Sequence, residues 1–512
     1  MTAIADASID PAGQVPDKTA APALPLWLLK VVVGYFVVAK ILYAVVVPPN
    51  GDESYYWIWG LHPQISYLDH APLVGWGSFL SMHLFGWTPF ALHVVPLLGT
   101  AVMILTFRLW ARYLTPANPA YFFWASTAVF FASPLMLILS TLLYPDQLLM
   151  PISLLAMTSL AIFLADYERG TARWRYLYLG AALIGFAILS KYNGAVVGAG
   201  LLFALIVRPK LRPLFKAPQL YLAGVIAALF LIPIILWSVG HGFDSVKLHA
   251  VNRFENRGSG FGFGGVKSLL IQTALDLSPL LLWPLFRFVT ARRLGGFAGS
   301  LHAVALGMFL ASTIATTALA SWNPAAGQVV PHWNIMGLLP VAAMAAFFIR
   351  SRWYLAATLG LGAIVAGAAV LYYVLCPLPA DALGIADGEA VVTFGLDDVY
   401  RAAHAAQIAR HADFIGTLSY SSAGQLAFGA GSGDGIISVS PALDQYDLWY
   451  DQDALKGKTA VMMVQWPGQD QQLSQLFDHV EKIGDVNTER LGHKLWTFGL
   501  YLGTGFHGGN AP

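Results

Sequence analysis

Residues 48–59 read PPNGDESYYWIW and directly follow the first apolar segment of the chain, at residues 26–47. Two adjacent carboxylates, Asp52 and Glu53, stand there beside a group of large aromatic side chains. Ionisable groups at a bilayer boundary are costly unless they are paired or used in function. We therefore predict that the loop at residues 48–89 carries the active site and that the rest of the chain is arranged around it.

The composition indicates an integral membrane protein. Of 512 residues, 57% are hydrophobic and 11% are charged, and the mean hydropathy is +0.61. Soluble domains carry about 25% charged residues. The formal net charge is +1 and no long basic run occurs, so nothing points to a nucleic acid partner.

Apolar stretches long enough to approach a bilayer span recur along the chain, since a span needs about 20 residues. They fall at residues 26–47, 90–112, 118–144, 147–165, 176–190, 193–207, 218–239, 267–290, 299–320, 332–349 and 353–376. With eleven spans and a cytoplasmic N-terminus, the basic clusters between them all become cytoplasmic, as the positive-inside rule expects. An apolar helix at residues 73–86 or a break at Ser133-Pro134 could raise the count. We predict a polytopic α-helical membrane protein with about 11–13 transmembrane helices.

Composition also predicts the domain boundaries. Residues 1–25 are rich in Ala, Pro and Asp and are expected to form a disordered cytoplasmic tail ahead of a membrane domain at 26–376. Residues 380–512 have the turns and charges of a soluble α/β domain, which an odd number of spans places in the periplasm. We expect its strands at 390–394, 415–418, 436–439, 460–464 and 495–498, and its helices at 399–410 and 471–480.

Three acids are candidate catalytic residues: Asp52, Glu53 and Asp146. A carboxylate at such a site can act as a general base that takes a proton from an attacking hydroxyl. The alternative for each is a helix cap, because acids favour helix N-termini.

The neighbouring side chains are expected to line the substrate path. This group comprises Tyr55, Tyr56, Trp57 and Asp69. The alternative for the aromatic residues is an aromatic belt at the membrane interface.

Four cationic or titratable residues are candidates for binding a phosphate. They are Lys191, His70, Arg253 and His332. The alternatives are a snorkelling lysine, a turn residue ahead of a proline, a solvated loop and an aromatic belt, respectively. No metal-binding spacing occurs, so we predict no metal and no certain cofactor, although Asp52, Glu53 and His residues could hold a divalent ion.

Five short motifs resemble one known family. They are DESYYW at 52–57, YLDHAP at 67–72, YPD at 144–146, LSKY at 189–192 and PHW at 331–333. These motifs and their order over residues 26 to about 350 resemble the integral-membrane glycosyltransferases of the C superfamily. The similarity is to the branch of protein O-mannosyltransferases, lipid A aminoarabinose transferases and rhizobial galacturonosyltransferases. The C-terminal domain is not covered.

The resemblance implies a polyprenyl-phosphate sugar donor, transfer on the periplasmic face and inversion without a covalent enzyme intermediate. It implies that Asp52 is the catalytic acid of the first outer loop and that Asp146 is a second acidic position. His70 stands where relatives carry a cation or histidine before proline. One departure is His93, in ALHVVP at 91–96, where relatives often carry arginine; Lys191 or Arg253 could replace that phosphate contact.

We therefore predict a glycosyltransferase of the bacterial inner membrane, with the lipid bilayer and a lipid-linked sugar as its partners. The expected acceptor is lipid A, another lipid or an envelope glycan, with protein less favoured. The alternative is a flippase or transporter of lipid-linked sugars, although such proteins tend to show internal repeats and polar sites near the midplane. A non-catalytic envelope scaffold is a third class, which predicts no donor binding.

Overall fold

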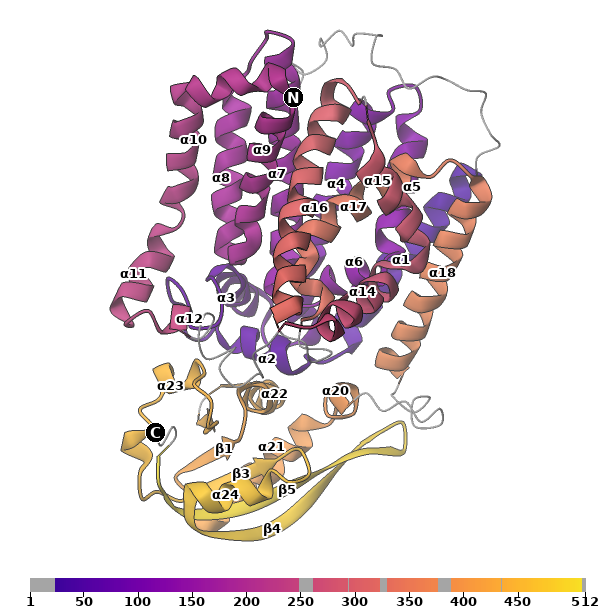
Figure 1. The fold of residues 1–512 in the computed structure, drawn as a ribbon. Helices are drawn as coiled ribbons and strands as arrows, with labels where there is room; N and C mark the ends of the chain where they lie inside the picture. Colours follow the sequence, from indigo (N-terminus) through magenta and orange to yellow (C-terminus); the bar gives the residue numbers. More distant parts are fainter. Residues whose placement is uncertain are drawn as a thin grey trace.

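The computed structural model describes residues 24–247, 261–322, 329–375 and 388–508, except residues 293 and 434. A large helical bundle lies above a small domain built on a β-sheet, and the two meet at a layer of short helices (Figure 1). Of the predicted tail at 1–25, only residues 24 and 25 are described. Arg253 also lies outside the described residues.

Within the described ranges, six helical segments are long and apolar enough to cross a membrane, or up to nine if each bent pair counts as one span. The six are α1 (Leu26–Val46), α4 (Pro89–Leu114), α7 (Pro145–Glu168), α16 (Gly296–Trp322), α17 (Ile335–Phe348) with its preceding turn η6 (Pro331–Asn334), and α18 (Arg352–Val370) with η7 (Leu371–Leu375). The predicted polytopic helical architecture is confirmed.

Several of the eleven predicted stretches are shorter or more broken than the sequence suggested. The stretch at 118–144 divides into α5 (Pro119–Phe131) and α6 (Pro134–Leu139), because Pro134 starts a new helix after Ser133. The stretch at 176–190 forms the 17-residue α8 (Trp174–Ser190). These interruptions explain why fewer than eleven helices meet the length criterion in the described part of the chain.

Three bent pairs account for the remaining candidate spans. They are α9 (Val196–Val207, after η2 at Tyr192–Ala195) with η3 (Pro209–Lys216), α10 (Pro218–Leu229) with α11 (Ile232–Gly240), and α14 (Phe263–Leu277) with η5 (Pro279–Leu281) and α15 (Leu282–Thr290). A short helix, α12 (Asp244–Lys247), ends the described part of that region.

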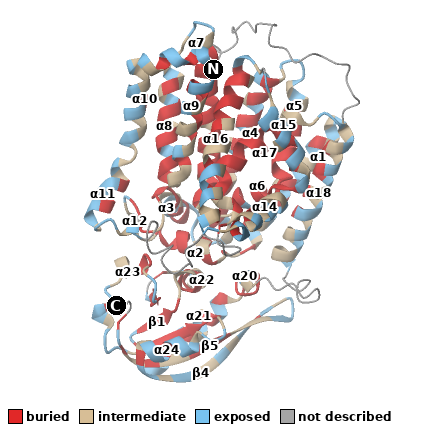
Figure 2. Ribbon diagram, viewed as in Figure 1, coloured by how far each residue is buried: buried red, intermediate tan, exposed pale blue. Residues whose placement is uncertain are grey.

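Helix α7 forms the centre of the bundle. It packs against α4, α8 and α16, and nearly all of its residues are buried, whereas α1, α10 and α18 expose apolar side chains outward (Figure 2). Apolar outer faces on long helices are what a lipid environment requires.

The first loop forms two short helices at the end of the bundle that faces the sheet domain: α2 (Gly51–Ile58) and α3 (Leu73–Phe85) (Figure 1). The predicted apolar helix at 73–86 is thus a separate helix, which Gly86 ends with a φ of 73°.

The C-terminal domain has one five-stranded sheet in the order β2-β1-β3-β5-β4. Its strands are β1 (Phe414–Thr417), β2 (Ile436–Ser438), β3 (Ala460–Val464), β4 (Phe477–Arg490) and β5 (His493–Phe506). Strands β1, β2 and β3 are parallel, and β4 and β5 form an antiparallel hairpin. Its helices are α20 (Gly388–Val391), α21 (Leu396–Arg410), α22 (Tyr420–Ala430), α23 (Tyr446–Trp449) and α24 (Asp470–Leu476), with the turn η8 (Asp453–Leu455).

The predicted α/β domain is confirmed, and two of its predicted elements were wrong in part. Residues 390–394 begin in helix α20 and form no strand, because a short apolar run does not distinguish a buried helix from a buried strand. The helix predicted at 471–480 ends at Leu476, where the long strand β4 takes over.

The sheet domain packs against α2 through α22. A Cβ atom added at Gly424 of α22 would lie 2.8 Å from the amide nitrogen of Tyr55, and one at Gly51 would lie 2.7 Å from the Cβ of Ser421. Glycine at both positions allows this close approach. Trp57 of α2 and Leu426 of α22 belong to the same hydrophobic core, so α2 is built into the junction between the two parts.

Candidate active site

Helix α2 begins with a capping box. The Asn50 side chain accepts a hydrogen bond from the Glu53 amide at 3.0 Å, and the Glu53 carboxylate accepts one from the Asn50 amide at 3.2 Å. This reciprocal pair fixes the helix start. It thereby fixes the direction of Asp52, which lies between the two residues.

Glu53 is fully buried on the bundle side of α2. Its Oε1 lies 3.2 Å from Nε2 of His93 and accepts a hydrogen bond from the Leu143 amide at 2.8 Å. The other ring nitrogen of His93 lies 2.7 Å from the carbonyl oxygen of Pro89. Glu53 takes part in the cap of α2, as its alternative described, and it also joins α2 to α4 and to the turn before α7. It is not among the residues that line the cavity described below.

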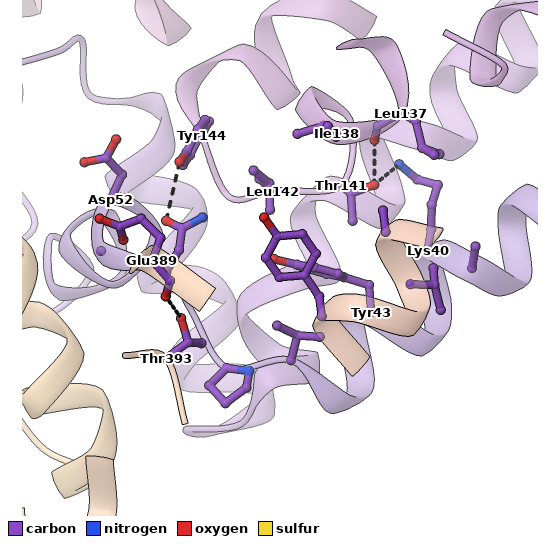
Figure 3. Close-up of a pocket in the computed structure, with 18 of the residues that line it drawn as sticks. Lys40, Tyr43, Asp52, Leu137, Ile138, Thr141, Leu142, Tyr144, Glu389 and Thr393 are labelled. Atoms are coloured by element: carbon purple, nitrogen blue, oxygen red, sulfur yellow. Dashed lines mark hydrogen bonds between the residues drawn. The ribbon is translucent and has the colours of Figure 1, made fainter. Parts of the chain in front are cut away.

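Asp52 contacts the sheet domain instead, and it lies at one end of a cavity of about 520 Å³ where the bundle meets that domain. The side chain is half-buried, and the Tyr420 hydroxyl of α22 donates to its Oδ1 at 3.3 Å. Glu389 lies near Asp52 at the same end (Figure 3). A half-buried carboxylate that lines a cavity is placed to accept a proton from a bound molecule.

The cavity is largely apolar away from Asp52. Its walls come from α1, the α6 region, α18 with η7, and the start of the sheet domain. The lining residues are Ala39, Lys40, Tyr43, Val47, Pro48, Asn50, Gly51, Asp52, Leu137, Ile138, Thr141, Leu142, Tyr144, Ala366, Ala369, Val370, Tyr373, Glu389, Thr393, Tyr420 and Ser421. Such a mixture suits an amphiphilic molecule with a polar group near Asp52.

A second carboxylate, Asp69, is bound to α2. The Tyr55 hydroxyl donates to Asp69 Oδ2 at 2.6 Å and accepts a hydrogen bond from the Gln445 amide of the sheet domain at 3.0 Å. Burial, followed by the charges of Asp69 and Asp444, raises the pKa of Tyr55 well above its ordinary value. Tyr55 is therefore a neutral hydrogen-bond donor that positions Asp69.

Tyr56 lies among the predicted ionisable residues. Its ring centroid is 5.9 Å from that of His70 and 6.2 Å from that of Tyr144. Burial raises its pKa, and the charges of Asp52 and Asp69 raise it further. The structure thus brings Asp52, Asp69 and His70 around one tyrosine, although they are up to 18 residues apart in sequence.

The three aromatic residues predicted to line the substrate path lie in the protein core. Tyr55, Tyr56 and Trp57 are buried, and among the described residues they are not part of the cavity lining. Trp57 packs on Trp87 and Phe428 within the core. The aromatic side chains that do line the cavity are Tyr43, Tyr144, Tyr373 and Tyr420.

Asp146 and Lys191 form an ion pair with each other. The Lys191 ammonium lies 3.0 and 2.8 Å from the two carboxylate oxygens, and both side chains are largely buried. Ser190 donates to the Pro145 carbonyl oxygen at 2.6 Å, which joins the same two segments. The pair lies close to Tyr144, so it belongs to the same end of the bundle as α2. A phosphate at Lys191 would share that ammonium with Asp146.

The last two predicted phosphate contacts are Arg253 and His332. Arg253 lies outside the described residues. His332 is half-buried in η6, which packs against α14, α16 and α17. Neither His332 nor Lys191 is among the described residues that line the cavity. No group of three or more His, Cys, Asp or Glu side chains in the described ranges could hold a metal ion.

Sequence reasoning missed the contribution of the sheet domain. Tyr420 and Glu389 carry no motif and are separated from Asp52 by more than 330 residues. The sequence offered one indirect signal, a serine at position 419 that favours a helix start just before Tyr420. In the structure the Ser419 side chain caps α22 by accepting a hydrogen bond from the Ser422 amide at 3.2 Å. The role of His93 was also missed, since the sequence showed only that it replaces an arginine.

Comparison with known proteins agrees with this geometry. Residues 69–237 match the dolichyl-phosphate-mannose-protein mannosyltransferase family. ArnT from Cupriavidus metallidurans bound to undecaprenyl phosphate has a similar structure, with a TM-score of 0.56, 14% identity, and coverage of 93% of this chain and 97% of that one. Its apo state gives a TM-score of 0.50 at 15% identity over the same shares.

This is the fold of the C superfamily of membrane glycosyltransferases. The resemblance read from the sequence motifs is thereby confirmed. The C-superfamily fold extends beyond the motif-bearing region, because the ArnT match covers 93% of the chain. No curated protein sequence matches the chain significantly.

Proposed function

We propose that this protein transfers a sugar from a polyprenyl-phosphate donor to an acceptor of the bacterial cell envelope. The donor class is supported by the ArnT structure, which holds undecaprenyl phosphate, and by the mannosyltransferase family that matches residues 69–237. The observation that carries the proposal is the position of Asp52, a half-buried carboxylate that lines one end of a largely apolar cavity where the bundle meets the sheet domain.

In the proposed reaction, Asp52 removes the proton from an acceptor hydroxyl as its oxygen attacks the anomeric carbon of the donor sugar. The bond between that carbon and the phosphate oxygen breaks, and the lipid phosphate leaves with the electron pair. Attack from the face opposite the leaving group inverts the anomeric centre. Tyr420 holds Asp52 in place, and Tyr55 holds Asp69 beside it.

Charge on the departing phosphate needs a cation nearby, because electrostatic stabilisation of such charge is a large part of catalysis. The ring of His70 lies 5.9 Å from that of Tyr56, whose hydroxyl is close enough to Asp52 for its charge to raise the pKa of the tyrosine, and we assign His70 that role. Lys191 contributes through its pair with Asp146, which fixes the same end of the bundle. We place this end at the periplasmic face, with the N-terminus in the cytoplasm, because the basic loops then follow the positive-inside rule.

The test is sugar transfer from a labelled polyprenyl-phosphate sugar, supplied with an envelope lipid extract, by full-length protein in detergent. Asp52→Asn should lower turnover by about 10²–10⁴-fold, the contribution of a general base. Asp453→Asn, at an exposed carboxylate of the sheet domain, is the matched control and should retain turnover.

Equal turnover of the Asp52→Asn variant and the wild type would remove Asp52 from the reaction. Donor movement across vesicles without any transfer would favour a flippase instead. Unchanged melting temperature of the Asp52→Asn variant is required, so that loss of activity is not loss of fold.

A further inference from the structure

A buried lysine stands at the end of the cavity opposite Asp52. Lys40 belongs to α1, lines the cavity and is 2% exposed (Figure 3). The reaction proposed above makes no use of it. Its position therefore calls for a separate explanation.

The described contacts of Lys40 are with neutral groups. Its ammonium donates to Ser140 Oγ and to Thr141 Oγ1, both at 2.8 Å, and lies 5.4 Å from the ring centre of Phe131. The two hydroxyls in turn donate to the carbonyl oxygen of Leu137. An ammonium has three donors, so two hydroxyls leave one for a ligand.

A cation in this position is expensive without an anion. Burial of an ionised ammonium is among the costliest events in folding, and within a membrane segment such residues mark functional sites. Among the described residues, Lys40 takes part in no ion pair. An acidic group that enters the cavity would supply the missing charge.

The departing phosphate of the donor is too near Asp52 to be that group. Six residues, or about 9 Å of helix axis, separate Lys40 from the end of α1 at Val46. Helical side chains also tilt toward the N-terminus, which is away from Asp52. By contrast, the attacked carbon lies about 3–3.5 Å from the acceptor oxygen, and that oxygen must be within hydrogen-bond reach of Asp52.

The wall between the two ends suits hydrocarbon better than sugar. Leu137, Ile138, Leu142, Ala366 and Val370 contribute to the lining, together with the side chains of Tyr43 and Tyr373. Sugar hydroxyls against the aliphatic side chains would lose hydrogen bonds to water without replacement. A hydrocarbon segment bearing an acidic group would fit both the wall and Lys40.

We propose that Lys40, Ser140 and Thr141 bind a phosphate or carboxylate carried by a lipid acceptor. The acidic group anchors the acceptor at the inner end of the cavity, and its hydroxyl reaches toward Asp52. The identification of this ligand as the sugar acceptor rests on the proposed function. The binding of an anion by Lys40 does not depend on it.

The test measures binding of decyl phosphate and of decanol to full-length protein in a neutral detergent, by the shift in melting temperature with ligand concentration. Lys40→Met should raise the dissociation constant of decyl phosphate at least tenfold and leave that of decanol unchanged. Lys30→Met is the matched control, because Lys30 is an exposed lysine on the same helix, and it should bind both probes as the wild type does.

Equal binding of decyl phosphate by the wild type and the Lys40→Met variant overturns the proposal. If Lys40→Met does not fold, Thr141→Val replaces it, with an expected rise of threefold or more in the same constant. Thr106→Val is its control, because the Thr106 hydroxyl bonds only within α4. A Thr141→Val variant that binds as its control does also overturns the site.

A competition experiment separates this site from the donor site. Saturating undecaprenyl phosphate should leave decyl phosphate bound through Lys40. Complete displacement would mean that the donor phosphate occupies the site, and the proposal would fall. Lys40-dependent binding in a chain that transfers no sugar would retain the anion site and reject the proposed function, so the two failures are distinguishable.

Discussion

Helix α2 is held from two sides, and the two sides differ. On the bundle side, Glu53 is closed in by His93 and the Leu143 amide and is fully buried. On the side of the sheet domain, Asp52 accepts a long hydrogen bond from Tyr420, is only half-buried and lines a cavity. One side is a closed structural contact, and the other keeps a carboxylate accessible.

The difference shows how two adjacent acids acquire different roles. Successive residues of an α-helix project about 100° apart, because a turn holds 3.6 residues. A capped helix between two packed parts therefore directs Glu53 into one part and Asp52 toward the gap between them. The bundle fixes the helix, and the sheet domain completes the surroundings of the reactive group.

The largest expected effect on stability comes from breaking the bundle-side contact. Glu53→Gln replaces the buried carboxylate that lies beside His93 and accepts from the Leu143 amide, and weaker hydrogen bonds to a charged group cost about 1.5–3 kcal/mol. We expect a clear fall in the melting temperature of the protein in detergent. Turnover per folded molecule should fall less than in the Asp52→Asn variant.

Glu481→Gln is the control, since this exposed carboxylate lies 4.0 Å from Arg410 and such surface pairs contribute little. A Glu53→Gln variant as stable as this control would mean that the bundle-side contact does not hold α2.

The second expected effect is a pH dependence of stability, which arises at Asp444 where the sheet domain contacts α2. Asp444 precedes Gln445, which binds Tyr55 and the Leu68 amide. Burial, followed by the charge of Asp447, raises the pKa of Asp444 to about 8. The folded state then holds a proton that the unfolded state releases near pH 4. Stability from this group is full below that pH and is lost as pH rises toward 8, at about 1.4 kcal/mol per pH unit.

The measurement is the melting temperature of the full-length protein between pH 5 and pH 8. The decline of the wild type over this range should be smaller in Asp444→Asn, which carries no titrating carboxyl at this position. Asp453→Asn should follow the wild type. If the melting temperatures of the wild type and Asp444→Asn changed in parallel with pH, Asp444 would not be the source of the pH dependence.

The smallest effect is expected at the hydroxyl that contacts Asp52. Tyr420→Phe removes one hydrogen bond to a carboxylate. Hydrogen bonds to charged groups contribute about 1.5–3 kcal/mol, and this long one is expected near the lower value of about 1.5 kcal/mol. Burial and the charge of Asp52 raise the pKa of Tyr420, so the wild-type hydroxyl remains a neutral donor. We expect turnover to fall about tenfold with little change in melting temperature.

Tyr400→Phe, on α21 away from the cavity, should match the wild type in the same transfer assay. A Tyr420→Phe variant that loses stability but not turnover would show that the sheet domain only supports the fold.

Much of the architecture could be predicted from sequence because hydrophobicity acts locally. The apolar runs, the change of composition after Pro377 and the strands at β1, β2 and β3 were all evident from short windows. The breaks were less evident: α5 and α6 form separate helices, and residues 390–394 start as a helix. Short runs leave these choices to tertiary packing.

The candidate site could be predicted only in part. Asp52 was predicted as a site residue from its position after the first span, and the structure brings Asp52, Asp69 and His70 close to the same residue, Tyr56. The pairing of Lys191 with Asp146 and the approach of Tyr420 to Asp52 depend on contacts between distant segments. No local pattern encodes such contacts.

The sequence by itself determined that this protein is a helical membrane protein with a sheet domain, and that acids and aromatic residues gather after its first span. Only the tertiary structure decided that Glu53 is enclosed while Asp52 lines a cavity with Lys40 at its far end. The physical reason is that composition and periodicity reflect each residue's preference for water or lipid, which is local. The partner of a buried charge depends on which helices pack together, and that is a property of the whole fold.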